Sequence, residues 1–274
     1  MTRSIKLFGL KRVKVAFAGL LVIMTLLATT APAYATVTTI TPSNADTYLT
    51  ADSPTLNWGT SNVMRILSSG ATWYRVLVKF DLSSIPSGST INTASLQLYY
   101  EGVVNDPVGR TYTANRVTTN WVEGNGNGGG TTGATWNKPD QSQTPTWTTA
   151  GGDFTTTGAA SEVVPATFGY MTWDVTAIVK AWIEGGQPNY GFLMKDLNEN
   201  VGGTVGAYFW TREYGSYMPI LTVDYSATPA PSGPTGPVGG LMEPVNKLVV
   251  FAPYLVLLGV IGAVAVVVWK RPDN

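Results

Sequence analysis

The stretch from Arg75 to Tyr100 constrains the fold most, because each of its halves alternates between two kinds of side chain with a period of two. The inner faces of the two halves are apolar and comprise Val76, Val78, Phe80 and Leu82, then Ala94, Leu96, Leu98 and Tyr100. Pro86 and Gly88 lie between the halves and favour a turn. The pattern predicts two amphipathic strands that form the central hairpin of an antiparallel sheet.

Shorter stretches along the chain have the composition of further strands. They are residues 46–49, 64–67, 110–117, 168–173, 189–195, 205–211 and 219–225. Asp174 can cap one short helix, whose apolar side recurs at Val175, Ile178, Val179 and Trp182 and which ends at Gly185 and Gly186. Residues 124–133 are almost entirely Gly, Asn and Thr and predict a loop, whereas 134–165 should be ordered but irregular. We therefore expect an all-β fold, a sandwich of jelly-roll type with one short covering helix, over residues 46–226.

The first 35 residues predict a secretory signal peptide. Five basic residues precede an apolar run from Val15 to Ala28, and Ala33-Tyr34-Ala35 provides a cleavage site of small residues. An uncleaved signal anchor is the alternative. Residues 36–45 are a polar lead-in to the folded domain.

The C-terminal part predicts a membrane anchor. Residues 227–247 are rich in Pro and Gly and form a linker, and residues 248–269 are 22 uncharged, mostly apolar residues that are enough for one crossing. Lys270 and Arg271 belong to a short tail, residues 270–274, that should stay in the cytoplasm. The expected product is a single-pass type I protein of the cell membrane with an extracellular domain. A GPI-anchor signal is the alternative, and the basic tail argues against it.

Composition excludes several classes of function. Residues 36–247 carry 10 Lys and Arg against 16 Asp and Glu, a net charge of −6, so nucleic acid is not an expected partner. The chain has no cysteine and no histidine. It therefore cannot form disulfides, a Ser-His-Asp triad or a His-ligated zinc site.

Five motifs in a fixed order carry a resemblance to a known family. They are Arg75–Ile85 (RVLVKFDLSSI), Trp173–Gly185 (WDVTAIVKAWIEG), Asn189–Leu193 (NYGFL), Phe209–Glu213 (FWTRE) and Pro219–Tyr225 (PILTVDY). Together they resemble the DNRLRE domain, which is similar to carbohydrate-binding module family 96. The resemblance implies a jelly-roll module on a surface or secreted protein that binds polysaccharide, including acidic polymers such as alginate. The whole-chain plan resembles that of archaeal surface proteins related to disaggregatases.

Two sets of residues are candidates for contacts with a glycan. Arg75, Lys79 and Arg212 form a basic set whose charges suit the carboxylates of a polyuronate, and structural ion pairing with Asp81, Asp174 or Glu213 is the alternative. The second set is aromatic, since sugar rings present apolar C–H faces that can pack on exposed rings. It comprises Trp136, Trp147, Tyr208 and Tyr214, with Trp136 and Trp147 expected to be the more exposed, and anchoring in the core is the alternative.

A structural calcium ion is a weaker expectation. Asp196, Asn198 and Asn200 match the start of a calcium-binding loop, but Val201 and Ala207 stand where that loop needs Gly and Glu. The alternative is a hairpin turn. No spacing of carboxylates indicates a hydrolase, so we expect no catalytic residues.

The sequence thus predicts a cell-surface, noncatalytic carbohydrate-binding module whose partner is an acidic polysaccharide. The alternatives are a structural or adhesive envelope module that contacts other proteins, and a polysaccharide-degrading enzyme of disaggregatase type.

Overall fold

The computed structural model describes residues 35–227. The predicted signal peptide up to residue 34, the linker from residue 228, the membrane helix at 248–269 and the tail lie outside the described residues. Within the described part, no helix has the length and apolar character required to span a bilayer.

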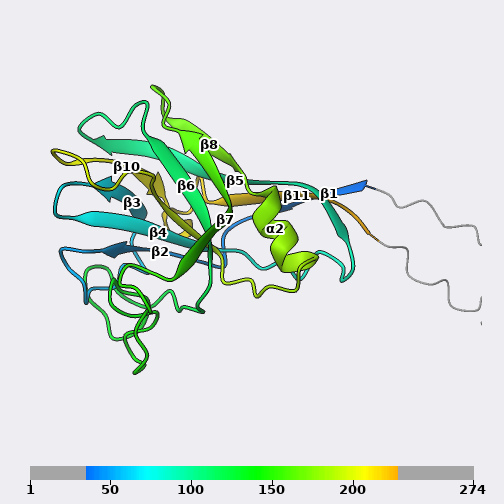
Figure 1. Ribbon diagram of the computed structural model, residues 1–274, viewed down its shortest axis with the longest axis horizontal. Helices are drawn as coiled ribbons and strands as arrows, with labels where there is room; N and C mark the ends of the chain where they lie inside the picture. Colours follow the sequence, from blue (N-terminus) through cyan, green and yellow to red (C-terminus); the bar gives the residue numbers. More distant parts are fainter. Residues whose placement is uncertain (1–34, 228–274) are drawn as a thin grey trace, which may run out of the picture. The chain divides into compact units, whose positions relative to one another are not determined.

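Eleven strands, one α-helix and one 3₁₀-helix make up the described part (Figure 1). They are β1 (Ala35–Ile40), β2 (Ala45–Thr50), β3 (Val63–Ser68), β4 (Trp73–Lys79), β5 (Thr90–Val104), β6 (Thr111–Val117), β7 (Phe154–Val163), β8 (Gly169–Asp174), α2 (Thr176–Ile183), β9 (Phe192–Asp196), β10 (Val205–Trp210), η1 (Arg212–Tyr214) and β11 (Ile220–Ser226). The predicted all-β fold with one short helix is confirmed. Two strands were not predicted: β1 falls in the expected polar lead-in, and β7 falls in the expected irregular region.

All the strand pairs are antiparallel, and their order is β1-β11-β5-β10-β3-β4-β9-β6-β7, with β2 on β4 and β8 on β5. The apolar faces of β4, β9 and β6 pack against those of β5, β8, β10 and β11 in one core, which makes the arrangement a sandwich. β3 and β4 share only two residue pairs, Leu67 with Tyr74 and Ser68 with Trp73, so the chain passes from one layer to the other there.

The predicted hairpin between residues 75 and 100 is wrong. β4 pairs with β2, β3 and β9, whereas β5 pairs with β8, β10 and β11, so the two strands belong to opposite layers. Phe80, Leu82 and Ile85 in the connection are buried in the core between the layers. Alternation shows which face of each strand is buried. Here the apolar face of β4 and the apolar face of β5 both point into the same core. Alternation does not show which strand lies beside which.

A second apolar cluster lies on the outer face of β2, β4 and β9. Residues 118–153, which we call the covering loop, fold over Leu49, Leu77 and Leu193 on that face. The covering loop contributes the side chains of Trp121, Trp136 and Trp147 to this cluster. Trp136 and Trp147 are only 7% and 4% exposed, so the expectation that they are exposed is wrong. The reason is that the second face of β4 also carries an apolar residue, Leu77, and is covered instead of facing water.

Asn57 holds the glycine-rich part of the covering loop in place. Its Nδ2 donates to the carbonyl oxygens of Glu123 and Ala134, at 2.6 and 2.9 Å, and its Oδ1 accepts from the backbone N–H groups of Gly59 and Gly126, at 3.1 and 2.8 Å. Gly124 has a φ of 94° and lies so close to the Asn57 amide that a Cβ atom would collide with it. The run of glycines therefore allows the chain to wrap around one buried side chain.

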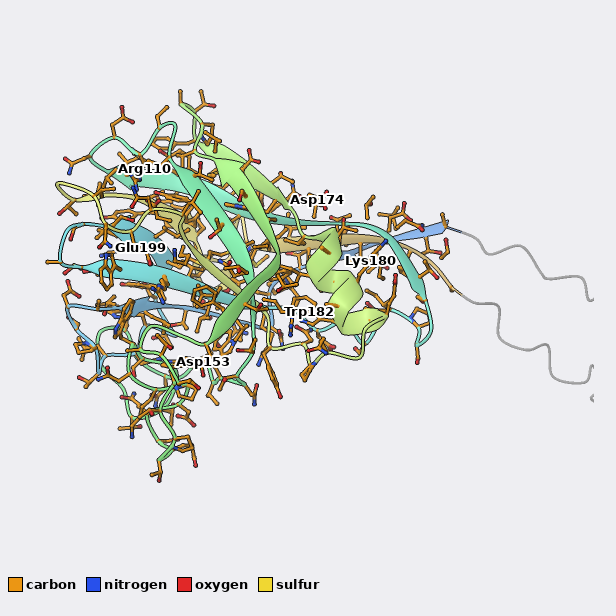
Figure 2. All side chains as sticks on the ribbon, in the orientation of Figure 1. Arg110, Asp153, Asp174, Lys180, Trp182 and Glu199 are labelled. Atoms are coloured by element: carbon orange, nitrogen blue, oxygen red, sulfur yellow. The ribbon has the colours of Figure 1, made fainter. Side chains whose placement is uncertain are left out.

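The predicted helix is confirmed as α2, which buries Ile178, Val179 and Trp182 and contacts β5 and β7. Asp174 Oδ1 accepts hydrogen bonds from the backbone N–H and hydroxyl of Thr176, at 3.0 and 2.5 Å. Figure 2 shows Trp182 and α2 towards one end of the sandwich and Arg110 and Glu199 towards the other.

Candidate functional site

The three predicted basic residues do not form one cluster. Arg75 and Lys79 are four residues apart on β4, about 13 Å at roughly 3.3 Å per residue, and both lie beneath the covering loop rather than on an open face. Arg212 begins η1 and lies near Lys79, since both interact with Glu123.

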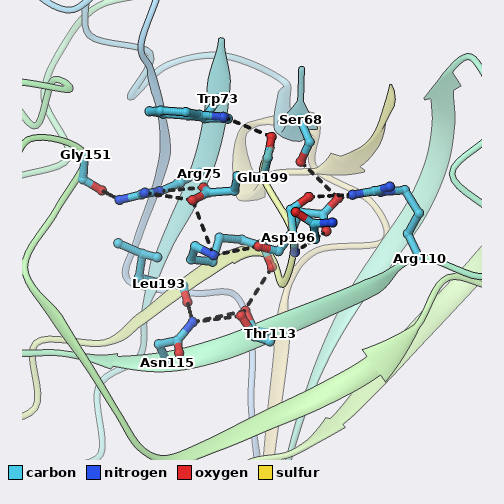
Figure 3. Close-up of polar contacts among 12 residues, drawn as sticks. Ser68, Trp73, Arg75, Arg110, Thr113, Asn115, Gly151, Leu193, Asp196 and Glu199 are labelled. Carbon is cyan, nitrogen blue, oxygen red and sulfur yellow. Dashed lines mark hydrogen bonds and ion pairs between the residues drawn. The ribbon is translucent and has the colours of Figure 1, made fainter. Parts of the chain in front are cut away.

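Arg75 is bound on all sides by groups of the domain itself (Figure 3). Its Nε and Nη2 donate to the two carboxylate oxygens of Glu199, at 2.8 and 2.9 Å, and its Nη1 donates to the carbonyl oxygen of Gly151 at 2.9 Å. The guanidinium also lies over the ring of Trp136, 5.0 Å from its centroid. This geometry favours the alternative in which Arg75 is structural, with Glu199 as a partner that the sequence did not indicate.

Lys79 is half-buried, with its Nζ 5.1 Å from the centroid of the Trp121 ring. Burial lowers the pKa of Lys79, and the charge of Glu123 opposes that shift. Arg212 forms ion pairs with Glu123 and Glu213, and the latter is one of the structural partners considered from the sequence. The cations expected to meet a polyuronate are therefore placed against aromatic rings and acids of the domain.

The predicted calcium ligands are also arranged differently from the expectation. Asp196 is 2% exposed, and its Oδ2 accepts from Ser68 Oγ at 2.9 Å and from Arg110 Nε at 2.5 Å. Its Oδ1 accepts from the backbone N–H of Asn198 at 3.0 Å, while the side chains of Asn198 and Asn200 are exposed. A guanidinium thus already balances the Asp196 charge (Figure 3), which favours a structural turn over a calcium loop.

The layer formed by β8, β5, β11, β10 and β3 has an outer face that the covering loop does not cross, and aromatic side chains gather on it. Tyr99 of β5 stands opposite Tyr170 of β8, with the two rings edge to face at 5.2 Å. Tyr217, in the segment between η1 and β11, packs on Tyr99 with ring centroids 4.3 Å apart. We call Tyr99, Tyr170 and Tyr217 the tyrosine platform.

The tyrosine platform is open to solvent. Tyr170 is 40% exposed and Tyr217 52% exposed, although large aromatic rings usually bury most of their surface. Tyr217 has a φ of 50°, a conformation that is uncommon for a residue other than glycine. Backbone strain of this kind clusters at ligand-binding positions. Two exposed rings on a half-buried third ring are therefore the clearest candidate for a binding surface among the described residues.

A cation lies further along the same outer face. Tyr208 of β10 is paired with Gly102 of β5 on one side and with Arg65 of β3 on the other, and the Arg65 guanidinium lies 4.8 Å from the centroid of the Tyr208 ring. Arg65 is half-buried and forms no ion pair within residues 35–227, and its buried Nε has no hydrogen-bond partner there. Gly102 is three residues from Tyr99, about 10 Å along the strand.

Of the four predicted aromatic residues, Tyr208 and Tyr214 lie on this side of the domain, and Trp136 and Trp147 belong to the covering loop on the other side. Tyr208 carries Arg65, and Tyr214 is 41% exposed and stacks on Trp210 with centroids 3.6 Å apart. Sequence reasoning missed the tyrosine platform and Arg65. The available signal was that Tyr99 and Arg65 occupy the outward positions of alternating strands, but nothing in the sequence distinguishes an outward face that is covered from one that is open.

A cavity of about 400 Å³ on the other layer is a weaker candidate. It is lined by Thr118, Thr119, Thr148, Thr149, Gly152, Asp153 and Phe154. Asp153 is its one charged group, and its oxygens accept hydrogen bonds from Thr119 Oγ1 and from the N–H groups of Thr148 and Thr149, at 2.8 to 3.0 Å. Burial raises the pKa of Asp153, but the hydrogen bonds together outweigh burial, so the pKa lies below its usual value. This is expected for a carboxylate that fixes a loop.

The model of carbohydrate-binding module family 96 matches residues 36–225, which include nearly all of the described part. No curated protein matches the chain.

Proposed function

Because the chain belongs to carbohydrate-binding module family 96, we propose that it binds a polysaccharide on the outer face of β5 and β8, with the tyrosine platform as the stacking surface. The observation that carries this proposal is the exposure of Tyr170 and Tyr217, which both pack on the half-buried ring of Tyr99. Sugar rings present C–H groups that pack on aromatic faces, and three rings fixed against one another lose little conformational entropy when a ligand binds.

The proposed ligand is an acidic polysaccharide. Arg65 lies on the same face and forms no ion pair among the described residues, so its guanidinium could bind the carboxylate of a uronate unit while it stacks on the Tyr208 ring. Arg75 and Arg212 supply no such contact, because their guanidinium groups bind Glu199, Glu123 and Glu213. Acid recognition then rests on a cation that the sequence did not single out.

We further propose that the domain acts at the cell surface and without catalysis. The predicted signal peptide and membrane helix would hold it outside the cell on a Pro/Gly linker, as a single-pass type I protein. Several copies on one membrane would bind a long polymer by multivalency.

Equilibrium binding of the purified full chain to a soluble uronate polymer and to a neutral polysaccharide tests the proposal. Tyr170→Ala should weaken binding to the uronate polymer about tenfold, since an aromatic contact contributes about 0.5–1.5 kcal/mol beyond burial of its area. Arg65→Gln should weaken binding to the uronate polymer and leave any binding to the neutral polymer unchanged. Phe168→Ala is the matched control, because Phe168 is 59% exposed but packs on Tyr100 rather than on the tyrosine platform.

Other outcomes would favour the alternatives. Wild-type affinity of Tyr170→Ala would move the binding surface away from the tyrosine platform. Binding to envelope proteins without any sugar would favour the adhesive module, and release of reducing ends from the polymer would favour the enzyme.

A further inference from the structure

Three carboxylates from distant parts of the sequence meet on the side of the domain where η1 lies. Asp46 comes from β2, Glu123 from the covering loop and Glu213 from η1, and one oxygen atom of each lies within 4.8 Å of the others. Arg212 lies among them and forms ion pairs with Glu123 and Glu213. We call these three acids the carboxylate cluster.

Two oxygens of the carboxylate cluster are buried and have no hydrogen-bond partner among the described residues, namely Asp46 Oδ1 and Glu213 Oε2. Asp46 is only 1% exposed, so water does not solvate it freely. Its other oxygen, Oδ2, accepts from Ser43 Oγ at 2.5 Å and from the N–H of Arg212 at 3.2 Å. A buried carboxylate oxygen without a partner is costly, which makes this position one that needs a further ligand.

The charges of the carboxylate cluster do not balance. The Arg212 guanidinium and the nearby Lys79 ammonium face three carboxylates, so one negative charge remains when all three are ionised. Burial, together with the charges of Glu213 and Glu123, raises the pKa of Asp46 to about 7. Burial also raises the pKa of Glu123. The excess carboxylate charge and the two buried oxygens without a partner among the described residues are what a divalent cation would offset.

We propose that the carboxylate cluster binds a calcium ion, with Asp46 Oδ1 and Glu213 Oε2 as ligands and Glu123 beside them. All the donors are carboxylate oxygens, the ligands that hard divalent cations prefer. Three segments that are distant in the sequence suit the flexible coordination of Ca²⁺ better than the strict octahedron of Mg²⁺. The ion would tie η1 and the covering loop to β2.

Thermal unfolding of the purified full chain, treated with EDTA and then titrated with CaCl₂ alone, tests this site. A ligand that binds only the folded state at a hundredfold excess over its Kd should raise the midpoint by about 5–11 °C for a domain of this size. MgCl₂ at the same concentration should raise it less. Isothermal titration calorimetry of the same sample should show one Ca²⁺ per chain.

Two variants make the result decisive. Asp46→Asn and Glu213→Gln each keep the shape of the side chain and remove a proposed ligand charge, so both should lose the CaCl₂ response. Glu213 is the more accessible of the two, so Glu213→Gln decides the question if Asp46→Asn fails to fold. Glu162→Gln on β7, at the far end of the strand order, is the control and should respond as the wild type does. No shift of the wild type at millimolar CaCl₂, or an unchanged response in Glu213→Gln, would overturn the proposal.

Discussion

At the scale of single residues, the role of a charged side chain depends on whether it has an ion-pair partner within the domain. The sequence identifies Arg75 and Lys79 as cations on one face of a strand, and both are there. It cannot identify Glu199, because 124 residues separate Glu199 from Arg75 and only the fold brings them together. The sequence therefore suggests Arg75 as a ligand contact, whereas in the folded domain Arg75 forms a structural ion pair with Glu199.

Arg75→Met should destabilise the domain without altering its glycan affinity. The substitution leaves Glu199 with only Lys195 as an ion-pair partner and removes the hydrogen bond to Gly151, and breaking a largely buried pair costs about 3–5 kcal/mol. Denaturant unfolding followed by tryptophan fluorescence measures the loss. Arg116→Met is the control, since Arg116 is half-exposed on β6 and forms no ion pair within the described residues. A fully stable Arg75→Met chain that had lost polysaccharide binding would assign Arg75 to the ligand site instead.

At the scale of elements, alternation predicts strands well where one face is buried. β5 is recognisable for this reason and α2 from its period of 3.6, whereas β4 and β6 each bury four consecutive residues and therefore both faces. β1 and β7 were missed because they lie at the two ends of the strand order, where few residues are buried and threonine is common. The sequence does not predict that the covering loop packs on the outer face of β4, because its three tryptophans show no periodic spacing.

Asn57→Ala should open the covering loop while the sandwich remains folded. The substitution leaves two carbonyl groups and two N–H groups of the loop region without their buried partner, and each such group costs about 1–3 kcal/mol. Limited proteolysis with mass spectrometry should therefore find new cleavage sites between residues 118 and 153. Asn92→Ala, which removes an exposed hydrogen bond to Asp224, should be cleaved as the wild type is. Unchanged proteolysis of Asn57→Ala would show that the tryptophans alone hold the loop.

At the scale of the whole molecule, the two outer faces of the sandwich differ in what covers them. The covering loop closes one of them, which is why Arg75, Trp136 and Trp147 are buried and Lys79 is half-buried. On the other face Tyr170 and Tyr217 are exposed, and Arg65 is half-buried. Fold class and family follow from local pattern and motif order, whereas the position of the binding surface depends on which face a long irregular loop covers.

Hydroxyl-radical footprinting of the full chain, with and without a bound uronate polymer, tests the central claim most directly. Mass spectrometry reports oxidation residue by residue, and Tyr170 and Tyr217 are exposed enough to be labelled. The account predicts that the polymer protects Tyr170 and Tyr217 severalfold and leaves the oxidation of Phe168 unchanged. Protection confined to the covering loop, with Tyr170 and Tyr217 oxidised as in the free protein, would contradict it.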